Sequence, residues 1–134
     1  ALKPVMTLKS KVIATRWLEK HAFVGYGSLH RCERKTRVAV VAMGYGDGYP
    51  LNVENGLPVL IHGERYTSLG KIAMDRLVVD ITNAASYILP GDEVVLWGEG
   101  LEVEEIALRS GRSADELLCG IQNRVRFYWD DNER

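Results

Sequence analysis

The chain has 134 residues, which is enough for one domain with a sizeable hydrophobic core. Its 17 basic and 18 acidic side chains nearly cancel, so it lacks the strongly basic surface of a nucleic-acid-binding domain or a polybasic membrane anchor. No apolar stretch approaches the roughly 20 residues of a membrane-spanning helix. The composition therefore predicts a soluble globular domain with no nucleic-acid partner and no membrane partner.

The first half of the chain predicts two strands and a turn. Residues 5–14 alternate between apolar and polar side chains, with Leu8, Val12 and Ala14 on the side expected to face the core. Residues 37–44 form a nearly continuous apolar run, which is typical of a strand covered on both faces. The stretch GYGDGYP follows, and its glycines are expected to turn the chain rather than continue the strand.

Further strand signals fill the middle of the chain. Residues 58–66 predict a hairpin that turns at residues 62–63. Residues 71–82 hold two strand-like pieces that meet near Met74, and residues 90–98 predict a turn followed by a strand. Short strands with frequent turn signals are typical of a small barrel or a sandwich.

The pattern becomes helical after residue 100. Val103 and Ile106 recur at helical spacing, and Gly111 is placed to end that helix. Ser113 and Glu116 stand three residues apart, the spacing of a capping box that begins a second helix. The fold predicted is mainly β: a small closed or partly open Greek-key-like β-barrel with a short C-terminal helical pair.

Motifs that indicate other classes of protein are weak. Cys32 and Cys119 lack the spacing of metal ligands, so we expect no metal site and free thiols in a reducing cytoplasm. The helical pair superficially follows a helix-turn-helix layout. Its second helix begins with Asp115 and Glu116, however, and these acidic residues argue against DNA binding.

Two tyrosines lie between glycines and are the candidate functional residues. Tyr26, in VGYGS, could act as a base, but a phenol has a pKa near 10 and needs a nearby cation to do so at neutral pH. Tyr45, in MGYGDGY, lies in a tight turn at a strand end, where binding groups often occur. The local sequence alone favours a packed strand residue for Tyr26 and a plain loop for Tyr45, and it favours core packing for Met74.

Six short motifs together carry more information than any one of them. They are LKPVMTLKSKVIA, VGYG, RVAVVAMGYGDGYP, LGKIAMDRLVVD, GDEVVLWG and DELLCGIQNRV. In this order and rough spacing they resemble the C-terminal domain of the bacterial alanine racemase family. The resemblance covers residues 2–128, which is nearly the whole chain.

The resemblance implies that residues 1–134 form only the second of two domains. The first, an α/β barrel that holds pyridoxal 5′-phosphate and carries the cofactor lysine, is absent from this chain, which begins at Ala1 without a methionine. The whole protein is then expected to be a cytoplasmic enzyme that interconverts L- and D-alanine and supplies D-alanine for peptidoglycan. The isolated domain is expected to bind little cofactor and to be inactive.

The resemblance also implies roles for single residues. Tyr26 matches the family's tyrosine base, and Tyr45 matches a second tyrosine near the amino-acid substrate. Met74 matches a position whose backbone N–H holds the substrate carboxylate. The family forms head-to-tail homodimers, so these residues are expected to act in the partner subunit's active site.

Three positions depart from the family pattern. Asp115 stands where a tyrosine commonly contacts the cofactor phosphate, and a carboxylate there would repel the phosphate. Lys71 stands at a position where arginine is common, and Leu51 where some members carry an arginine at the substrate entrance. These departures leave open a serine racemase, a broad-specificity racemase or, more distantly, an amino-acid decarboxylase. They also leave open a non-catalytic β module that only dimerises or binds a partner.

Overall fold

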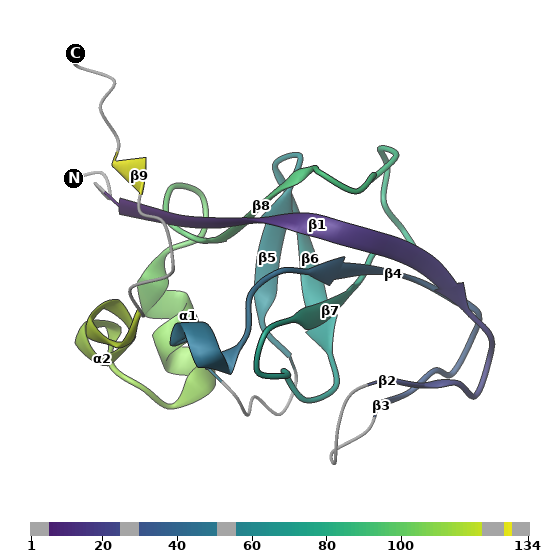
Figure 1. Cartoon of the computed structure of the whole chain (residues 1–134), viewed down its shortest axis with the longest axis horizontal. Coiled ribbons are helices and arrows are strands. Elements are labelled where there is room, and N and C mark those ends of the chain that lie inside the picture. Colours follow the sequence, from purple (N-terminus) through teal and green to yellow (C-terminus); the bar gives the residue numbers. More distant parts are fainter. Residues whose placement is uncertain (1–5, 25–29, 51–55, 122–127, 130–134) are drawn as a thin grey trace.

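The computed structural model describes residues 6–24, 30–50, 56–121 and 128–129, and its centre is a closed antiparallel barrel (Figure 1). Around the barrel the strands are β1 (Met6–Leu18), β4 (Thr36–Val41), β7 (Leu77–Asp80), β6 (Glu64–Leu69), β5 (Pro58–Ile61) and β8 (Glu93–Trp97). The barrel closes because β1 pairs with β4 and also with β8. The predicted mainly β barrel with a C-terminal helical pair is confirmed.

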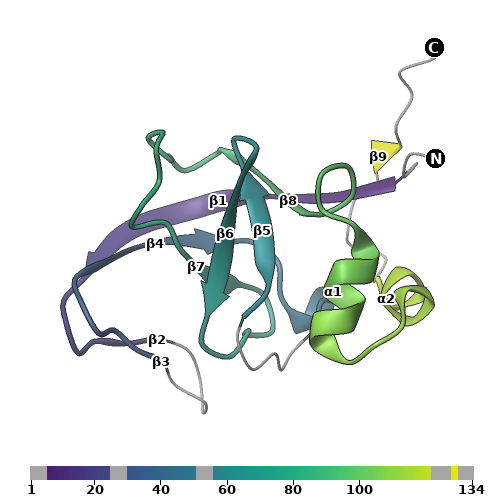
Figure 2. The ribbon, with the colours of Figure 1, turned by 180° about the vertical axis from the view of Figure 1, so that it is seen from behind.

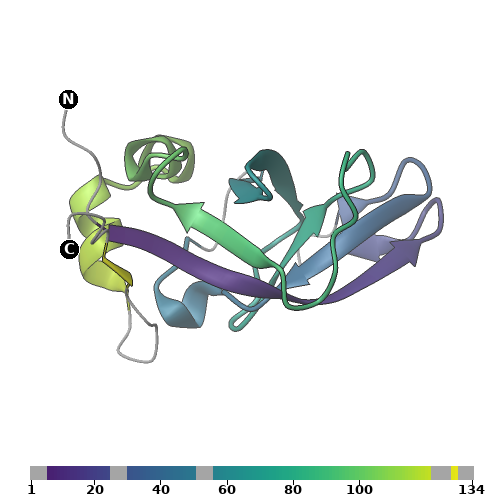
Figure 3. The same ribbon diagram turned by 90° about the horizontal axis from the view of Figure 1, so that it is seen from above.

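Strand β1 runs along the whole barrel (Figure 3), and its pairing with β4 contains a register shift. Its first half pairs with β8 and its second half with β4, and the shift between Val12 and Ala14 marks a β-bulge. Leu8 and Val12 are buried as predicted, but Ala14 is exposed. The prediction for Ala14 was wrong because the extra residue of the bulge reverses which side chains face the core.

Strand β4 is buried along almost its whole length. Val38 and Ala39 are neighbours and both are buried, so both faces of the strand are covered, as predicted. Ala39 and Val41 belong to the main hydrophobic core inside the barrel. Val38 is buried outside that core, on the opposite face of the strand.

The predicted hairpin is present between β5 and β6. Ile61 pairs with Glu64, and the two turn residues, His62 and Gly63, have φ angles of 54° and 77°. Two positive φ angles in a two-residue loop define the mirror-image turn that matches the twist of antiparallel strands.

The segment 71–82 contains one strand rather than two. Only β7 forms, and the preceding residues are a loop. The carbonyls of Ala73 and Met74 accept hydrogen bonds from the turn that follows β4, so these carbonyls are not available to a sheet ladder. The apolar pattern of the segment suits a strand. The loop therefore results from its contacts with a distant segment rather than from its own sequence.

Two short helices close one end of the barrel (Figure 2). Helix α1 (Val103–Ser110) ends at Gly111, which has a φ of 72°, and helix α2 (Ala114–Gly120) begins after Ser113. The Ser113 hydroxyl accepts from the Glu116 N–H at 3.1 Å, and the Glu116 carboxylate accepts from the Ser113 N–H at 3.0 Å. The predicted cap and capping box are therefore confirmed.

The remaining elements are small. Strands β2 (Phe23–Val24) and β3 (His30–Arg31) form a separate two-stranded sheet, and β9 (Tyr128–Trp129) pairs with the start of β1. Both cysteines are free thiols, with Cys32 buried and Cys119 exposed. Neither helix in the described ranges is long and apolar enough to cross a membrane.

Candidate active site

The turn after β4 is held by its own acidic residue. The 3-10 turn η1 (Tyr45–Asp47) is preceded by Gly44, whose N–H donates to the Asp47 carboxylate at 3.1 Å. Asp47 is buried, and its N–H donates back to the Gly44 carbonyl at 3.0 Å. These two hydrogen bonds close the turn on itself and give Tyr45 a rigid backbone. Sequence reasoning noticed this aspartate among the glycines but did not assign it the role of holding the turn.

The Tyr45 turn, residues 44–48, is attached to the Met74 loop, residues 70–76. The Tyr45 N–H donates to the Ala73 carbonyl at 3.1 Å, and the Gly46 N–H donates to the Met74 carbonyl at 2.8 Å. Val41 pairs with Leu77, so the turn after β4 and the loop before β7 begin side by side. The barrel thus brings together two of the predicted site residues, Tyr45 and Met74.

Glycine is required where the turn meets its neighbours. A Cβ added to Gly44 would lie 2.3 Å from the Ala73 carbonyl oxygen. A Cβ added to Gly48 would lie 2.0 Å from the Gly120 carbonyl oxygen, at the end of α2, and Gly48 also has a φ of 94°. The Tyr45 turn is therefore packed between the Met74 loop and the helical pair, with no room for a side chain at either contact.

The two side chains project outward from this buried support. Tyr45 is 44% exposed and Met74 is 59% exposed. Ile72 is buried and anchors the Met74 loop, and the Ala73 N–H donates to the Arg76 carbonyl. The Met74 N–H donates to no atom of the described residues. An open backbone N–H in a fixed loop can donate a hydrogen bond to a carboxylate oxygen of a ligand.

The comparisons with known proteins agree on one family. The family model described as "Alanine racemase, C-terminal domain" matches residues 5–129. This chain belongs to that family. The resemblance stated from the six motifs is therefore confirmed.

Relatives of the alanine racemase C-terminal domain family match nearly all of this chain. An alanine racemase of Coxiella burnetii (strain CbuG_Q212) is 44% identical over 125 residues, which is 93% of this chain and 34% of that protein. An alanine racemase of Chromohalobacter salexigens is 46% identical, with the same coverage of both chains. The chain thus spans about a third of the length of the curated relatives it matches.

Solved structures of alanine racemases have the same fold. The enzyme from Acinetobacter baumannii superposes with a TM-score of 0.87 at 36% identity, over 92% of this chain and 34% of that chain. The enzyme from Bartonella henselae, solved with covalently bound pyridoxal phosphate, superposes with a TM-score of 0.84 at 26% identity, over 88% of this chain and 33% of that chain.

Two residues singled out by the resemblance lie outside the described residues. These are Tyr26, matched to the family's tyrosine base, and Leu51, matched to the substrate entrance. The strands on either side of Tyr26 pair with each other, with Val24 opposite His30. Lys71 is described, and it lies partly buried in the Met74 loop.

Asp115, which stands at the position matched to a cofactor-phosphate contact, carries a negative charge that repels a phosphate. It is exposed in the first turn of α2, next to Glu116. Hydrogen bonds from Ser113 hold the pKa of the Glu116 carboxyl below its usual range, so Glu116 stays ionised there. Two carboxylates suit the positive end of the helix itself but repel a phosphate. No cluster of three or more metal-ligating side chains occurs in the described ranges either.

Proposed function

We propose that this chain is the C-terminal domain of a homodimeric, pyridoxal-phosphate-dependent enzyme that interconverts L- and D-alanine in the cytoplasm and supplies D-alanine for peptidoglycan. The observation that carries the proposal is the attachment of the Tyr45 turn to the Met74 loop by two backbone hydrogen bonds. It supports a site in which both residues serve one substrate. Family membership supports the reaction class.

The proposed chemistry needs a proton removed from one face of the substrate α-carbon and another returned to the opposite face. We assign the tyrosine side of this exchange to Tyr26, whose phenol acts as a general base and acid when a cation stabilises its ionised form. The family's cofactor supplies an electron sink for the charge left on the α-carbon. Because the family's cofactor lysine belongs to the barrel domain, we assign cofactor binding mainly to that domain, and the carboxylate of Asp115 is consistent with this assignment.

Met74 and Tyr45 are assigned to substrate binding. The open Met74 N–H donates a hydrogen bond to a substrate carboxylate oxygen, and the nearby Tyr45 side chain limits the space left for the substrate side chain. Together they form an exposed pair of large apolar side chains on a rigid support. Because both side chains are exposed, the partner subunit's active site can reach them, as the proposed role requires.

The decisive experiment is Tyr26→Phe in the whole protein, measured by exchange of the substrate α-proton with solvent for both enantiomers. Loss of a general base lowers exchange from one enantiomer by at least about a hundredfold. Tyr66→Phe is the matched control, because Tyr66 is a buried barrel residue outside the proposed site. Undiminished exchange for both enantiomers in Tyr26→Phe would overturn the assignment.

A non-catalytic dimerisation module is the second candidate, and Asp115 is the observation that favours it. Mixing this chain with a fragment that carries the N-terminal barrel separates the two functions. Restored racemisation supports the enzyme, whereas association without turnover supports the module. Comparing kcat/KM for alanine and serine then tests the serine and broad-specificity alternatives.

A further inference from the structure

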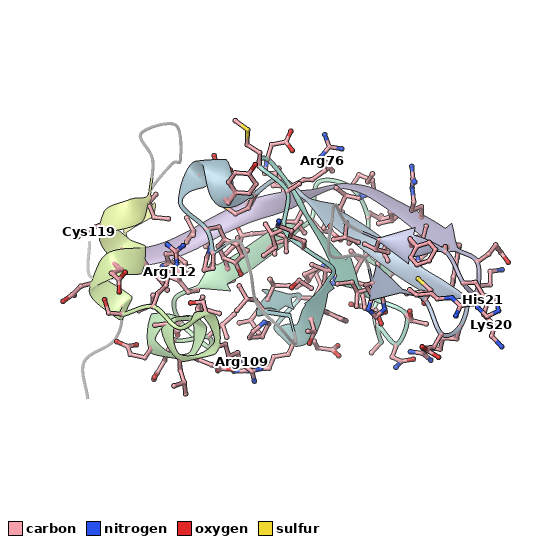
Figure 4. All side chains as sticks on the ribbon, turned by 90° about the horizontal axis from the view of Figure 1, so that it is seen from below. Lys20, His21, Arg76, Arg109, Arg112 and Cys119 are labelled. Carbon is pink, nitrogen blue, oxygen red and sulfur yellow. The ribbon has the colours of Figure 1, made fainter. Side chains whose placement is uncertain are left out.

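A recess opens at the end of the barrel opposite the helical pair. Its volume is about 540 Å³, and Trp17, Arg37, Ile81 and Tyr87 are among its lining residues. The far end of β1 leads to Lys20 and His21, at the other end of the molecule from Arg109 and Arg112 (Figure 4). A volume of this size is typical of small-molecule sites, which often occur in the mouths of β-barrels.

The recess continues the interior face of the barrel. On β4, Arg37 lies two residues before Ala39, so both point to the same face, and Ala39 belongs to the core. After the bulge in β1, Thr15 pairs with Ala39 and Trp17 pairs with Arg37. The bulge therefore places Trp17 at the mouth, where the apolar core gives way to a cation.

The Arg37 side chain is held in place, but among the described residues only its Nη2 atom has hydrogen-bond partners. Its Nη2 donates to the Ile88 carbonyl at 3.1 Å and approaches the Thr15 hydroxyl at 3.4 Å. Its Cζ lies 4.8 Å from the centre of the Tyr87 ring. A guanidinium also donates from Nε and Nη1, and these two nitrogens have no partner in the described ranges. Arg37 is thus a rigid donor with open N–H groups.

The other polar groups of the recess favour the binding of an anion. The Ser86 hydroxyl is hydrogen-bonded to the His62 ring nitrogen Nδ1 at 2.7 Å, and the Thr82 hydroxyl donates to the Asp80 carboxylate at 2.6 Å. Arg16 is exposed at the edge of the recess, and because it pairs with Val38, its side chain lies on the opposite face of β1 from Trp17. The lining contains the Arg37 guanidinium and no acidic side chain among the described residues. A ligand must therefore accept hydrogen bonds, and it gains most if it is negatively charged.

The rim of the recess is aromatic. Trp17 is 53% exposed and Tyr87 is 73% exposed, and each ring already lies next to a cation, with Lys35 Nζ 5.3 Å from the centre of Trp17 and Arg37 over Tyr87. We propose that the mouth of the barrel binds a small aromatic carboxylate, whose carboxylate group accepts hydrogen bonds from the open N–H groups of Arg37. Its ring packs on Trp17 and Tyr87. The aromatic rim favours this ligand over a hydrated inorganic anion, which gains nothing from apolar contact.

The test uses indole-3-acetate as the probe and the whole 134-residue chain, followed by ¹H–¹⁵N NMR of the Trp17 indole N–H and the Arg37 Nε–H. Indole-3-acetate is expected to shift both signals with a dissociation constant of about 1 mM or tighter. Its neutral methyl ester is expected to bind at least about tenfold more weakly, because it cannot form charge-assisted hydrogen bonds. Inorganic phosphate is expected to leave the Trp17 signal in place.

Two variants make the result specific to the recess. Arg37→Gln is expected to weaken binding by about tenfold, followed at the Trp17 signal, because it removes the guanidinium that donates to the carboxylate, and an otherwise unchanged ¹H–¹⁵N spectrum checks that the fold is kept. Arg112→Gln removes the same charge at the opposite end of the molecule and is expected to leave the affinity unchanged (Figure 4). Absence of shifts at about 10 mM probe would overturn the proposal. Equal binding of the ester, the same shifts with phosphate, or equal losses in both variants would also overturn it.

Discussion

At the scale of single residues, the candidate site depends on glycines that permit close contact. Gly44 and Gly48 lie on either side of η1, and each touches a carbonyl oxygen of another segment more closely than any Cβ allows. Their role is steric as well as conformational. They let the Tyr45 turn lie directly on the Met74 loop and on the end of α2.

Gly48→Ala is expected to destabilise the chain much more than Gly91→Ala. Both glycines have similar φ angles, 94° and 96°, so both variants incur about 1 kcal/mol of left-handed strain. Only Gly48 faces a backbone oxygen at 2.0 Å from a new Cβ, whereas a Cβ on Gly91 meets nothing within 4 Å. The clash is expected to lower the free energy of unfolding of Gly48→Ala by about 2 kcal/mol or more beyond this strain, and urea unfolding measures the difference. Equal losses would contradict this account.

Tyr49 illustrates a different property of a single residue. Its ring stacks on Trp97 at 6.1 Å, and its buried hydroxyl has no partner among the described residues. Burial raises the pKa of Tyr49 far above that of a free phenol, because the ionised form would be poorly solvated.

Tyr49→Phe is expected to be neutral or stabilising at neutral pH, since it removes an unpaired buried hydroxyl. Because the folded pKa is raised, the wild-type stability is fully present below the unfolded pKa. It declines once the pH exceeds about 10, where the unfolded chain ionises first. The variant should therefore lose less stability at alkaline pH, measured by urea unfolding at neutral pH and near pH 11. Parallel losses in both proteins would assign the alkaline sensitivity to other groups.

At the scale of elements, the helical pair is tied to the barrel by charge as well as by core packing. Arg65 on β6 donates to both carboxylate oxygens of Glu105 on α1, and Arg109 donates to the same carboxylate at 3.1 Å. Ile106, the next residue of the helix, is fully buried in the core. The hydrogen bonds from Arg65 and Arg109 lower the pKa of the Glu105 carboxyl.

Glu105→Gln is expected to lower stability by about 1 kcal/mol at neutral pH, a modest value because the side chains are partly exposed to water. The lowered folded pKa means that the contribution is present above the unfolded pKa of about 4.3 and is lost as the pH falls through the folded value. Urea unfolding at neutral pH and near pH 3 measures the difference. Glu104→Gln, on the exposed side of α1, is the control and should have little effect at either pH.

At the scale of the whole molecule, barrel closure makes the candidate site. The Tyr45 turn and the Met74 loop are far apart in the chain, and they meet because β4 pairs with β7. The same closure places α2 against Gly48. Asp115, at the other end of α2, is thereby held in a defined position relative to the turn.

Asp115→Tyr tests whether that position faces the cofactor phosphate in the whole protein. The substitution removes a negative charge and adds a hydroxyl donor, so pyridoxal phosphate is expected to bind about tenfold more tightly. Equilibrium dialysis of the whole protein measures the affinity. Asp115→Asn separates the two effects, because it removes only the charge. Unchanged affinity in both variants would show that Asp115 points away from the phosphate.

The local features of this chain could be read from its residues. The hairpin at His62 and Gly63, the helix end at Gly111 and the capping box of Ser113 each depend on interactions within a few positions. Such interactions are the same in any fold that contains the segment. The family could also be predicted from the sequence, because six motifs in the same order are highly specific when taken together.

The predictions that failed concern positions whose structure depends on contacts with distant segments. Ala14 is exposed because a bulge shifts β1 against β4, and neither partner strand reveals the bulge in its own pattern. Residues 71–76 form a loop because their carbonyls serve the Tyr45 turn.

The sequence by itself thus determined the class of fold, the turns and caps, and the family, since periodicity and short-range hydrogen bonding are encoded locally. Only the tertiary structure placed Tyr45 beside Met74, left the Met74 N–H open and put Arg37 at the mouth of the barrel. These arrangements depend on which strands pair and in which register. Pairing between distant strands is decided by closure of the whole barrel, which no single stretch of residues specifies.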